Sequence, residues 1–367
     1  MRERSPRTNV SIALRAIALT ALVALVPAGC SSDREAPRSA ATRTGSTAPR
    51  TASSTTVPAP AGGCVVGPKL VPTCGVLWGS YPYDAHADTS VATSAAERAA
   101  GRPFDLVHQY HDFSNAGSSG RFPTADETAL MASGHVLHFG WSTSLWGRDP
   151  DHVSWRSIAD GRHDDVIDAQ AHRLVAMERA APGREYFIDF DHEPDGRDDH
   201  GSPADYIAAA RRVHDRLAAA GVTNAVWVWV IQNDVDGAAP FYPGDDVVDW
   251  IGYDPYNWVR CDDHRDPWLT FAETVTPTYD ALERAAWHAP KPLMLAEYGT
   301  VEGARVDDKQ RWLAGIPDAL ASLPHLRALE YFDDSDQTPG CDWALDSSPQ
   351  ATAGFATAGA ALTPVGS

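Results

Sequence analysis

Short apolar runs alternate with amphipathic stretches eight times between residue 64 and the C-terminus. The runs are almost continuously hydrophobic, which is typical of parallel strands that are buried on both faces. They occupy residues 75–79, 105–111, 135–141, 184–193, 225–231, 247–252, 292–299 and 326–332. Eight strand-and-helix units favour a closed (β/α)8 TIM barrel over an open sheet.

Helical patterns follow most of these runs. We expect helices at residues 91–100, 124–133, 164–181, 203–220, 270–289 and 307–322, with a weaker Ala-rich segment from residue 350. Thr124 and Glu127 have the spacing of a capping box, and Ser202-Pro203 is typical of a helix start. Residues 234–246 are rich in Pro and Gly and barely helical, so the fifth unit is the weakest part of the pattern.

The first 30 residues have the pattern of a secretory signal. Four arginines precede an apolar run, residues 16–28, that is too short to span a bilayer as a stable helix. The run ends in Val26-Pro-Ala-Gly-Cys30, which resembles a bacterial lipobox, where the cysteine is lipidated and becomes the new N-terminus. We therefore expect a secreted or cell-surface lipoprotein that touches the membrane only through Cys30. Cleavage by an ordinary signal peptidase is the alternative.

Residues 31–63 separate this signal from the barrel. They are mainly Ser, Thr, Ala, Pro and Arg, which cannot bury enough surface to fold, so we expect a disordered linker before a single domain at residues 64–367. The chain has a net charge of −19, and its first 63 residues hold eight arginines against three acidic residues, so the domain carries about −24. Such a domain repels nucleic acid and anionic polymers, whereas its charge does not exclude neutral substrates.

The cysteine content is compatible with two disulfides. If Cys30 is lipidated, four cysteines remain, an even number in an oxidising compartment. We predict that Cys64 pairs with Cys74 and that Cys261 pairs with Cys341, which would join the loops after the sixth and eighth strands. Two other pairings are formally possible, and free buried thiols are the alternative.

Two of the predicted strands end in a glutamate. The run at 184–193 ends in His192 and Glu193 before Pro194 breaks it, and the run at 292–299 carries Glu297. The glutamates are 104 residues apart, which at about 30 residues per unit is three units and some insertion. They therefore fall on strands 4 and 7, at the C-terminal strand ends where such barrels place catalytic groups.

Two carboxyl groups across a barrel mouth suit glycoside hydrolysis. A retaining enzyme needs one carboxylic acid to protonate the leaving oxygen and one carboxylate to attack the anomeric carbon, about 5–5.5 Å apart. The alternatives are purely structural roles, in which Glu193 caps a loop and Glu297 forms an ion pair with a loop arginine.

Three segments resemble glycoside hydrolase family 26, which includes endo-β-1,4-mannanases, some β-glucanases and β-1,3-xylanases. They are residues 191–196, 242–257 and 291–299. The first is similar to the family's acid/base segment and the third to its nucleophile strand, which implies that Glu193 is the acid/base and Glu297 the nucleophile. In the second, Tyr256 matches the tyrosine that hydrogen-bonds the nucleophile. As a general acid, Glu193 needs a raised pKa, to which a nearby negative Glu297 contributes.

Other side chains are candidates for binding a sugar. His192 can hold a sugar hydroxyl or orient Glu193, with a purely structural hydrogen bond as the alternative. Aromatic rings at strand ends can stack on pyranose faces, with plain packing as the alternative for each one. The tryptophans in such positions are Trp78, Trp141, Trp146, Trp258, Trp268 and Trp343, of which we favour Trp141, Trp258 and Trp343.

Metal binding is the weaker interpretation of the strand histidines. The pairs His108/His111 and His135/His138 place their members on opposite faces of a strand, so neither pair alone makes a zinc site. Asp189 and Asp191 alternate in phase with Glu193, so all three can point into the barrel. Hydrogen bonding to the histidines is favoured over a cation there, and we expect no cofactor and no metal.

These patterns together predict a monomeric, secreted, retaining endo-glycosidase that hydrolyses a neutral β-linked polysaccharide, with mannan favoured over β-glucan or xylan. Asp189 and the residues of strand 8 differ from those usual in the family, which motivates a second hypothesis, a catalytically silent glycan-binding protein at the cell surface. A third is a metal-dependent hydrolase that uses Asp189 and Asp191.

Overall fold

The computed structural model describes residues 64–367, apart from 85–86, 260, 262–263, 336–339 and 366–367. The predicted signal peptide (1–30), the linker (31–63) and the lipidation site Cys30 lie outside the described residues. None of the helices in the described part combines the length and the hydrophobicity that a membrane crossing requires.

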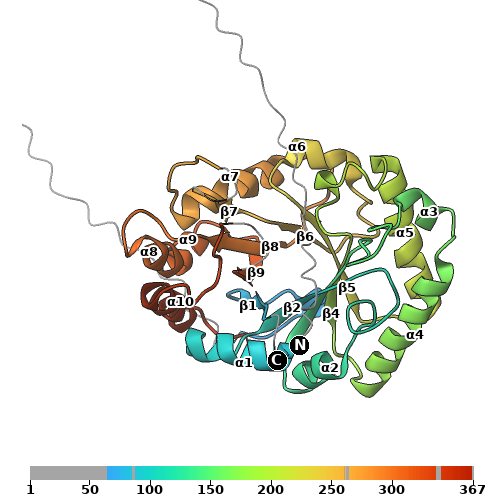
Figure 1. Ribbon diagram of the computed structural model, residues 1–367, viewed down its shortest axis with the longest axis horizontal. Coiled ribbons are helices and arrows are strands. Elements are labelled where there is room, and N and C mark those ends of the chain that lie inside the picture. Colours follow the sequence, from blue (N-terminus) through green and yellow to red (C-terminus); the bar gives the residue numbers. More distant parts are fainter. Residues whose placement is uncertain (1–63, 85–86, 260, 262–263, 336–339, 366–367) are drawn as a thin grey trace, which may run out of the picture. The chain divides into compact units, whose positions relative to one another are not determined.

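Eight parallel strands of the described chain close into a barrel, with the helices around it (Figure 1). Neighbours in the chain pair with one another, β6 pairs with β8, and β9 pairs with β1 to complete the ring. The strands are β1 (Leu77–Pro82), β2 (Leu106–His111), β3 (Val136–Trp141), β4 (Tyr186–Phe190), β5 (Ala225–Ile231), β6 (Trp250–Tyr253), β8 (Leu293–Thr300) and β9 (Leu326–Asp333). The two-residue β7 (Tyr256–Asn257) follows β6 and also pairs with β8. The predicted (β/α)8 TIM barrel is confirmed.

The helices lie close to the expected positions. They are α1 (Thr89–Ala100), α2 (Ala125–Ala132), α3 (Trp155–Ala159), α4 (Asp164–Ala180), α5 (Pro203–Ala219), α6 (Val235–Ala238), α7 (Phe271–Arg284), α8 (Asp308–Ala314), α9 (Ile316–Leu320) and α10 (Pro349–Ala361), with 3-10 turns η1 (Pro68–Leu70), η2 (Pro194–Gly196) and η3 (Ala239–Phe241). Thr124 and Glu127 form the predicted capping box at the start of α2, and Ser202 caps α5.

Two connections differ from a simple strand-and-helix unit. After β5 the chain forms only the four-residue α6 and the turn η3, in agreement with the Pro- and Gly-rich sequence there. The single helix predicted at residues 307–322 is divided into α8 and α9 at Gly315. Pro317 explains the division, because proline lacks the N–H that a continuous helix would need.

The barrel interior changes from apolar to polar along its axis. Leu77, Leu106, Phe187, Met294 and Ala328 pack together in the interior cluster. Alternate residues of a strand face the same side, so the positions two further along β2, β4 and β9 also face inward. They are His108, Asp189 and Glu330, all fully buried. The site described below therefore lies next to a layer of buried polar side chains, and the apolar interior cluster lies beneath that layer.

Both predicted disulfides are present in the structure. Cys64 is bonded to Cys74 and Cys261 to Cys341, with Cα–Cα distances of 5.2 and 5.0 Å. The second bond joins the segment after β7 to the segment after β9, both at the C-terminal end of the barrel.

Candidate active site

Glu297 reaches the barrel mouth because β8 is irregular at this point. Ala296 packs in the interior cluster and Tyr298 in the layer outside the strands, while the pairing with β9 shifts register between Leu295 and Tyr298. A bulge of this kind re-aims a side chain. The N–H of Glu297 donates to Asp254 Oδ1 at 2.8 Å. Asp254 therefore holds the irregular segment of β8 in place.

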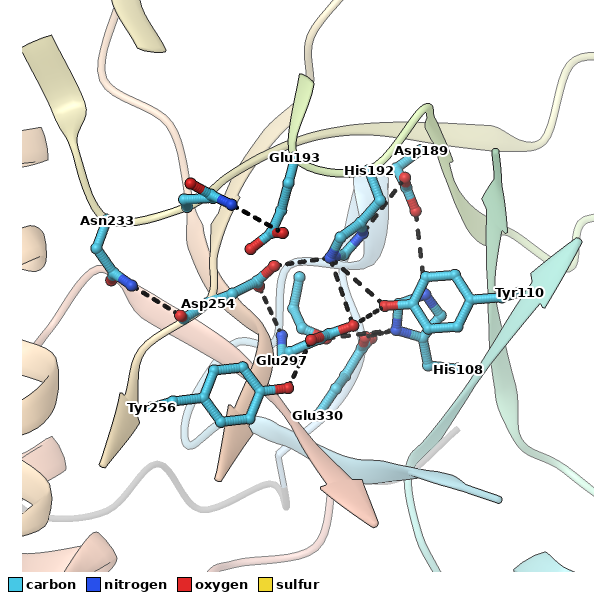
Figure 2. Close-up of polar contacts among 12 residues, drawn as sticks. His108, Tyr110, Asp189, His192, Glu193, Asn233, Asp254, Tyr256, Glu297 and Glu330 are labelled. Carbon is cyan, nitrogen blue, oxygen red and sulfur yellow. Dashed lines mark hydrogen bonds and ion pairs between the residues drawn. The ribbon is translucent and has the colours of Figure 1, made fainter. Parts of the chain in front are cut away.

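The carboxylate of Glu297 is surrounded by polar groups (Figure 2). The Tyr110 hydroxyl donates to Oε1, the Tyr256 hydroxyl donates to Oε2 at 2.5 Å, and His192 Nε2 lies 3.7 Å from Oε1. Burial raises the pKa of Glu297, and the charge of Glu193 adds to this, although His192 and the two tyrosine hydroxyls oppose it. Tyr256 thus makes the contact that the sequence resemblance implied.

Glu193 lies just beyond the end of β4, where the chain leaves strand geometry. Its backbone is left-handed, with φ 53° and ψ 57°, and η2 follows at once. A left-handed conformation costs a non-glycine residue roughly 1–2 kcal/mol, and such strain is concentrated at functional sites. The side chain is partly exposed, and Gln232 Nε2 donates to its Oε2 at 3.4 Å.

The two glutamates face a common space at the C-terminal end of the barrel (Figure 2). Glu193 follows the end of β4 and Glu297 lies in β8, the fourth and seventh barrel strands, as the sequence spacing predicted. In addition to burial, the negative charge of Glu193 raises the pKa values of both Glu297 and Asp254. Glu193 is therefore close enough to influence the protonation of both of these acids.

A second acidic group lies on the same loop as Glu193. Both carboxylate oxygens of Asp195 are 3.2 Å from the backbone N of Gln232, which donates to them. Burial, followed by the charge of Glu193, raises the pKa of Asp195 to about 7. Gln232 therefore connects the two acids, through its backbone to Asp195 and through its side chain to Glu193.

His192 is buried beneath the glutamates. Its Nε2 is 2.7 Å from Asp254 Oδ2, and its Nδ1 is 3.5 Å from Asp189 Oδ2. Burial alone would lower the pKa of His192, but Asp254 and Asp189 outweigh it and raise the pKa well above its usual range. These contacts correspond to the structural and orienting interpretations of His192, and its 6% exposure leaves little surface for a sugar hydroxyl.

Asp189 and Asp191 do not share a site, which corrects the expectation that both point into the barrel. Asp189 faces the interior, where its Oδ1 is 3.1 Å from His138 Nε2. Asp191 follows the end of β4 with a positive φ of 52°, which ends the strand alternation. Its carboxylate instead accepts hydrogen bonds from Thr143 and Trp155 outside the interior layer. The Asp191 carboxylate is therefore already hydrogen-bonded, which argues against the third hypothesis, a metal-dependent hydrolase that uses Asp189 and Asp191.

Two of the three favoured tryptophans are core residues. Trp141 is 1% exposed and stacks on Phe113. Trp343 is 2% exposed and packs against the ring of Tyr256 at a centroid distance of 4.7 Å. Neither presents a ring face to a substrate, because packing covers it. Trp258 is partly exposed, but one of its faces stacks on His264 at a centroid distance of 4.6 Å. Only Trp258 of the three remains available as a sugar platform.

Several residues of the site were not singled out from the sequence. They are Tyr110, Asp254, Gln232 and Asp195. For Tyr110 a signal exists, because it is two residues after His108 on the same strand and so faces the same side. The others follow the ends of β4, β5 and β6 in segments without a regular period, where the sequence gives residue types but no direction.

Comparisons with known sequences agree with the resemblance. The model of the family described as Glycosyl hydrolase family 26 matches residues 196–278, a range that contains Tyr256 and lies between the two glutamates. Endoglucanase H of Acetivibrio thermocellus is 28% identical over 269 residues, which cover 70% of this chain and 27% of that protein. The chain thus spans about a quarter of the length of this relative.

Solved structures share the barrel. One is a β-mannanase from a symbiotic protist of the termite Reticulitermes speratus, complexed with gluco-manno-oligosaccharide, with 16% identity, a TM-score of 0.55 and coverage of 77% of this chain and 86% of that one. Another is a family 26 β-mannanase from Bacteroides ovatus, with 16% identity, a TM-score of 0.54 and coverage of 77% and 87%. At this identity the likeness establishes the fold alone. Together with the sequence matches, it confirms the resemblance of this chain to glycoside hydrolase family 26.

Proposed function

We propose that this chain is a retaining endo-glycosidase that hydrolyses a neutral β-linked polysaccharide, with Glu193 as acid/base and Glu297 as nucleophile. The observation that carries the proposal is the convergence of these two side chains, from β4 and β8, on one space at the barrel mouth. Their surroundings differ in the sense that the two roles require. Glu297 is fixed by hydrogen bonds, whereas Glu193 is partly exposed and lightly held.

The reaction proceeds in two displacements. In the first, a carboxylate oxygen of Glu297 attacks the anomeric carbon while the bond to the leaving oxygen breaks and Glu193 gives that oxygen its proton. In the second, Glu193, now a carboxylate, takes a proton from water, whose oxygen attacks the same carbon and releases Glu297. The hydroxyls of Tyr110 and Tyr256 hold the attacking carboxylate in one orientation.

The substrate is a neutral polysaccharide, with a mannan favoured and a β-glucan or xylan next. The support is the likeness to β-mannanases, the sequence similarity to an endoglucanase, and a domain charge of about −24 that disfavours acidic polymers. A reducing-sugar screen of the purified protein against mannan, glucomannan, mixed-linkage glucan and xylan tests this point. Binding without release of reducing ends would instead support the silent glycan-binding hypothesis.

The stereochemistry and the nucleophile have a direct test. A 2-deoxy-2-fluoro glycoside with a good leaving group should trap a covalent adduct, and peptide mass mapping should locate it on Glu297. Proton NMR of a fresh digest should show first the anomer that retains the configuration of the substrate. First formation of the opposite anomer, or an adduct on another residue, would overturn the double displacement.

We also propose that the protein is exported and anchored through a lipid on Cys30. The support is the lipobox-like sequence Val26-Pro-Ala-Gly-Cys30 after an apolar run. Mass spectrometry of the mature N-terminus should find Cys30 with a diacylglyceryl group, and Cys30→Ala should release the protein from membranes. A mature N-terminus at another residue would overturn the anchor.

A further inference from the structure

The position of the Glu193 carboxyl is set by the backbone more than by side-chain contacts. Its carboxylate is lightly held, by a hydrogen bond of 3.4 Å from Gln232 Nε2. Glu193 and His192 lie on the segment after β4 (Figure 2), and the residues on both sides of His192 are left-handed, with φ 52° at Asp191 and 53° at Glu193. Two such residues close together persist only where the surrounding structure holds them. The groups that hold this turn, residues 191–193, therefore decide where the Glu193 carboxyl lies.

Asp191 fixes the first residue of the turn. Its side chain is fully buried, and its carboxylate accepts hydrogen bonds from the loop after β3 and from the first residue of α3. Thr143 N donates to Oδ1 at 2.9 Å, Thr143 Oγ1 to Oδ2 at 2.8 Å, and Trp155 Nε1 to Oδ2 at 2.5 Å. The Asp191 N–H donates to the carbonyl of Trp141 at 2.9 Å. Both the backbone and the side chain of Asp191 therefore attach the turn to β3 and the segments that follow it.

Arg197 holds the same turn from the other side of Glu193. Its Nε donates to the carbonyl of His192 at 2.8 Å and lies 3.6 Å from Asp191 Oδ1. Its Nη1 donates to Ser144 Oγ at 3.5 Å, in the loop after β3. One guanidinium therefore contacts both residues that precede Glu193 and the loop to which Asp191 is attached.

The Asp191 carboxylate is charged although it is buried. Burial alone would raise its pKa, but Arg197, followed by His200 and the Thr143 N–H, outweighs burial and lowers the pKa below its usual range. His200 Nδ1 lies 3.3 Å from Oδ2. Hydrogen bonds to a charged acceptor are stronger than those to a neutral one. The turn is therefore held by a charged, fully buried group.

We propose that Asp191 and Arg197 are positioning residues for Glu193, which hold its carboxyl where it can give a proton to the leaving oxygen of the substrate. The observation that carries the proposal is the double attachment of the left-handed turn, at the side chain of its first residue and at the carbonyl of its second. The inference rests on the proposed function, because it assigns a role in that reaction. Loss of either residue should impair proton transfer more than the attack by Glu297, whose carboxylate is held by Tyr110 and Tyr256.

Dependence on the leaving group is the first measurement. Purified variants are assayed on polysaccharide and on an aryl glycoside whose leaving group needs no proton. Asp191→Ala should lower kcat/KM on polysaccharide by up to about 100-fold, because a misplacement of about 1 Å can have that effect. On the aryl glycoside kcat/KM should stay near the wild-type value, because it reports formation of the intermediate. Arg197→Met, a change at a partly exposed side chain, should show the same selectivity with a smaller loss. An equal loss on both substrates would overturn the proposal.

A double-mutant cycle separates positioning from general damage to the site. In a Glu193→Ala background, Asp191→Ala should cause little further loss on polysaccharide, because the group that it positions is absent. If the two losses multiplied, Asp191 would act on the reaction by a route other than Glu193, and the proposal would be wrong.

Glu178→Ala is the matched control for stability. Glu178 is also a buried carboxylate with several donors, from Tyr186, Thr223 and Asn224, but it lies at the N-terminal ends of β4 and β5. The control should lower the unfolding temperature, as Asp191→Ala does, and keep the wild-type ratio of the two activities. A control that changed the ratio in the same way would mean that destabilisation alone produces the selectivity.

The variant Glu193→Ala distinguishes failure of this inference from failure of the proposed function. If it shows no selective loss on polysaccharide, Glu193 is not the acid, and the positioning role is overturned with the proposed function. If it shows the selective loss while Asp191→Ala and Arg197→Met do not, the proposed function stands and the positioning role alone is overturned.

Discussion

The two glutamates at the barrel mouth are held in opposite ways. The carboxylate of Glu297 accepts hydrogen bonds from two tyrosine hydroxyls, and its backbone N–H donates to Asp254. Its side chain is 15% exposed. Glu193 has a strained backbone and one side-chain hydrogen bond of 3.4 Å. A nucleophile must wait in one orientation, whereas an acid/base must deliver a proton and recover it from water. The difference in restraint therefore matches the difference in proposed role.

The largest effect is expected from Glu297→Ala, because no other group can form the covalent intermediate. Turnover on polysaccharide should fall by at least roughly 10⁴-fold with the fold retained, as checked by reducing-sugar release and circular dichroism. Glu302→Ala is a suitable control, since Glu302 lies in the loop after β8 and accepts from Ser347. Wild-type turnover in Glu297→Ala would mean that Glu297 is not the nucleophile, and the different restraint of the two glutamates would then not reflect different catalytic roles.

The next effect is that of Glu193→Ala, which should depend on the substrate. Polysaccharide hydrolysis should fall by roughly 10²–10⁴-fold, the usual contribution of a general acid/base. An aryl glycoside whose leaving group needs no proton should still form the intermediate, seen as a burst of released phenol. Added azide should then release a glycosyl azide of retained configuration. An equal loss on both substrates would mean that Glu193 does not act as the acid.

A smaller effect is expected from Tyr256→Phe, which removes one hydrogen bond to the Glu297 carboxylate. A hydrogen bond to a charged group contributes about 1.5–3 kcal/mol, so kcat/KM should fall about 10–100-fold. Tyr206→Phe is a matched control, because the Tyr206 hydroxyl donates to the carbonyl of Phe190 in the core. If the control lost as much activity as Tyr256→Phe, restraint of Glu297 would not explain the effect.

The sequence was most informative where the chain is regular. Near-continuous apolar runs set the eight strands. Counting units assigned Glu193 and Glu297 to the fourth and seventh of them, and in the structure Glu193 follows the end of β4 and Glu297 lies in β8. It was least informative where alternation fails. The left-handed Asp191 turns its side chain away from the interior, and the irregular pairing near Glu297 turns that side chain inward. Such local breaks depend on tertiary contacts, which periodicity does not contain.

The exposure of the tryptophans and the clustering of the buried histidines could not be predicted from the sequence for a related reason. Trp141 and Trp343 follow the same strand-end rule as Trp258, yet packing covers the first two. His108 and His138 belong to two different sequence pairs, His108/His111 and His135/His138. These two side chains meet only because β2 and β3 pair in that register. Register and burial are properties of the assembled barrel.

The smallest expected effect concerns Asp195, the acid that shares Gln232 with Glu193. Its pKa is raised to about 7 by burial and by Glu193, with Asp234 adding a little, against a usual value of 3.8. A carboxyl group whose pKa is higher in the folded state binds more protons there, so it makes stability fall as pH rises from about 4 to about 7. Asp195→Asn should remove this contribution, because the amide cannot ionise but its oxygen can still accept the Gln232 N–H.

The difference in stability between Asp195→Asn and wild type should therefore grow between pH 4 and pH 7 and then level off. Each pKa unit corresponds to about 1.4 kcal/mol, and screening of this partly exposed group reduces the total to on the order of 1–2 kcal/mol. Urea unfolding at several pH values measures it, and taking the difference cancels other acids such as Asp333, whose pKa burial also raises to about 7. In a Glu193→Gln background the pH-dependent difference should shrink, because the charge that raises the pKa of Asp195 is gone. A difference independent of pH would mean that the pKa of Asp195 is not raised in the folded protein. A difference unaffected by Glu193→Gln would mean that the two acids on this loop do not interact.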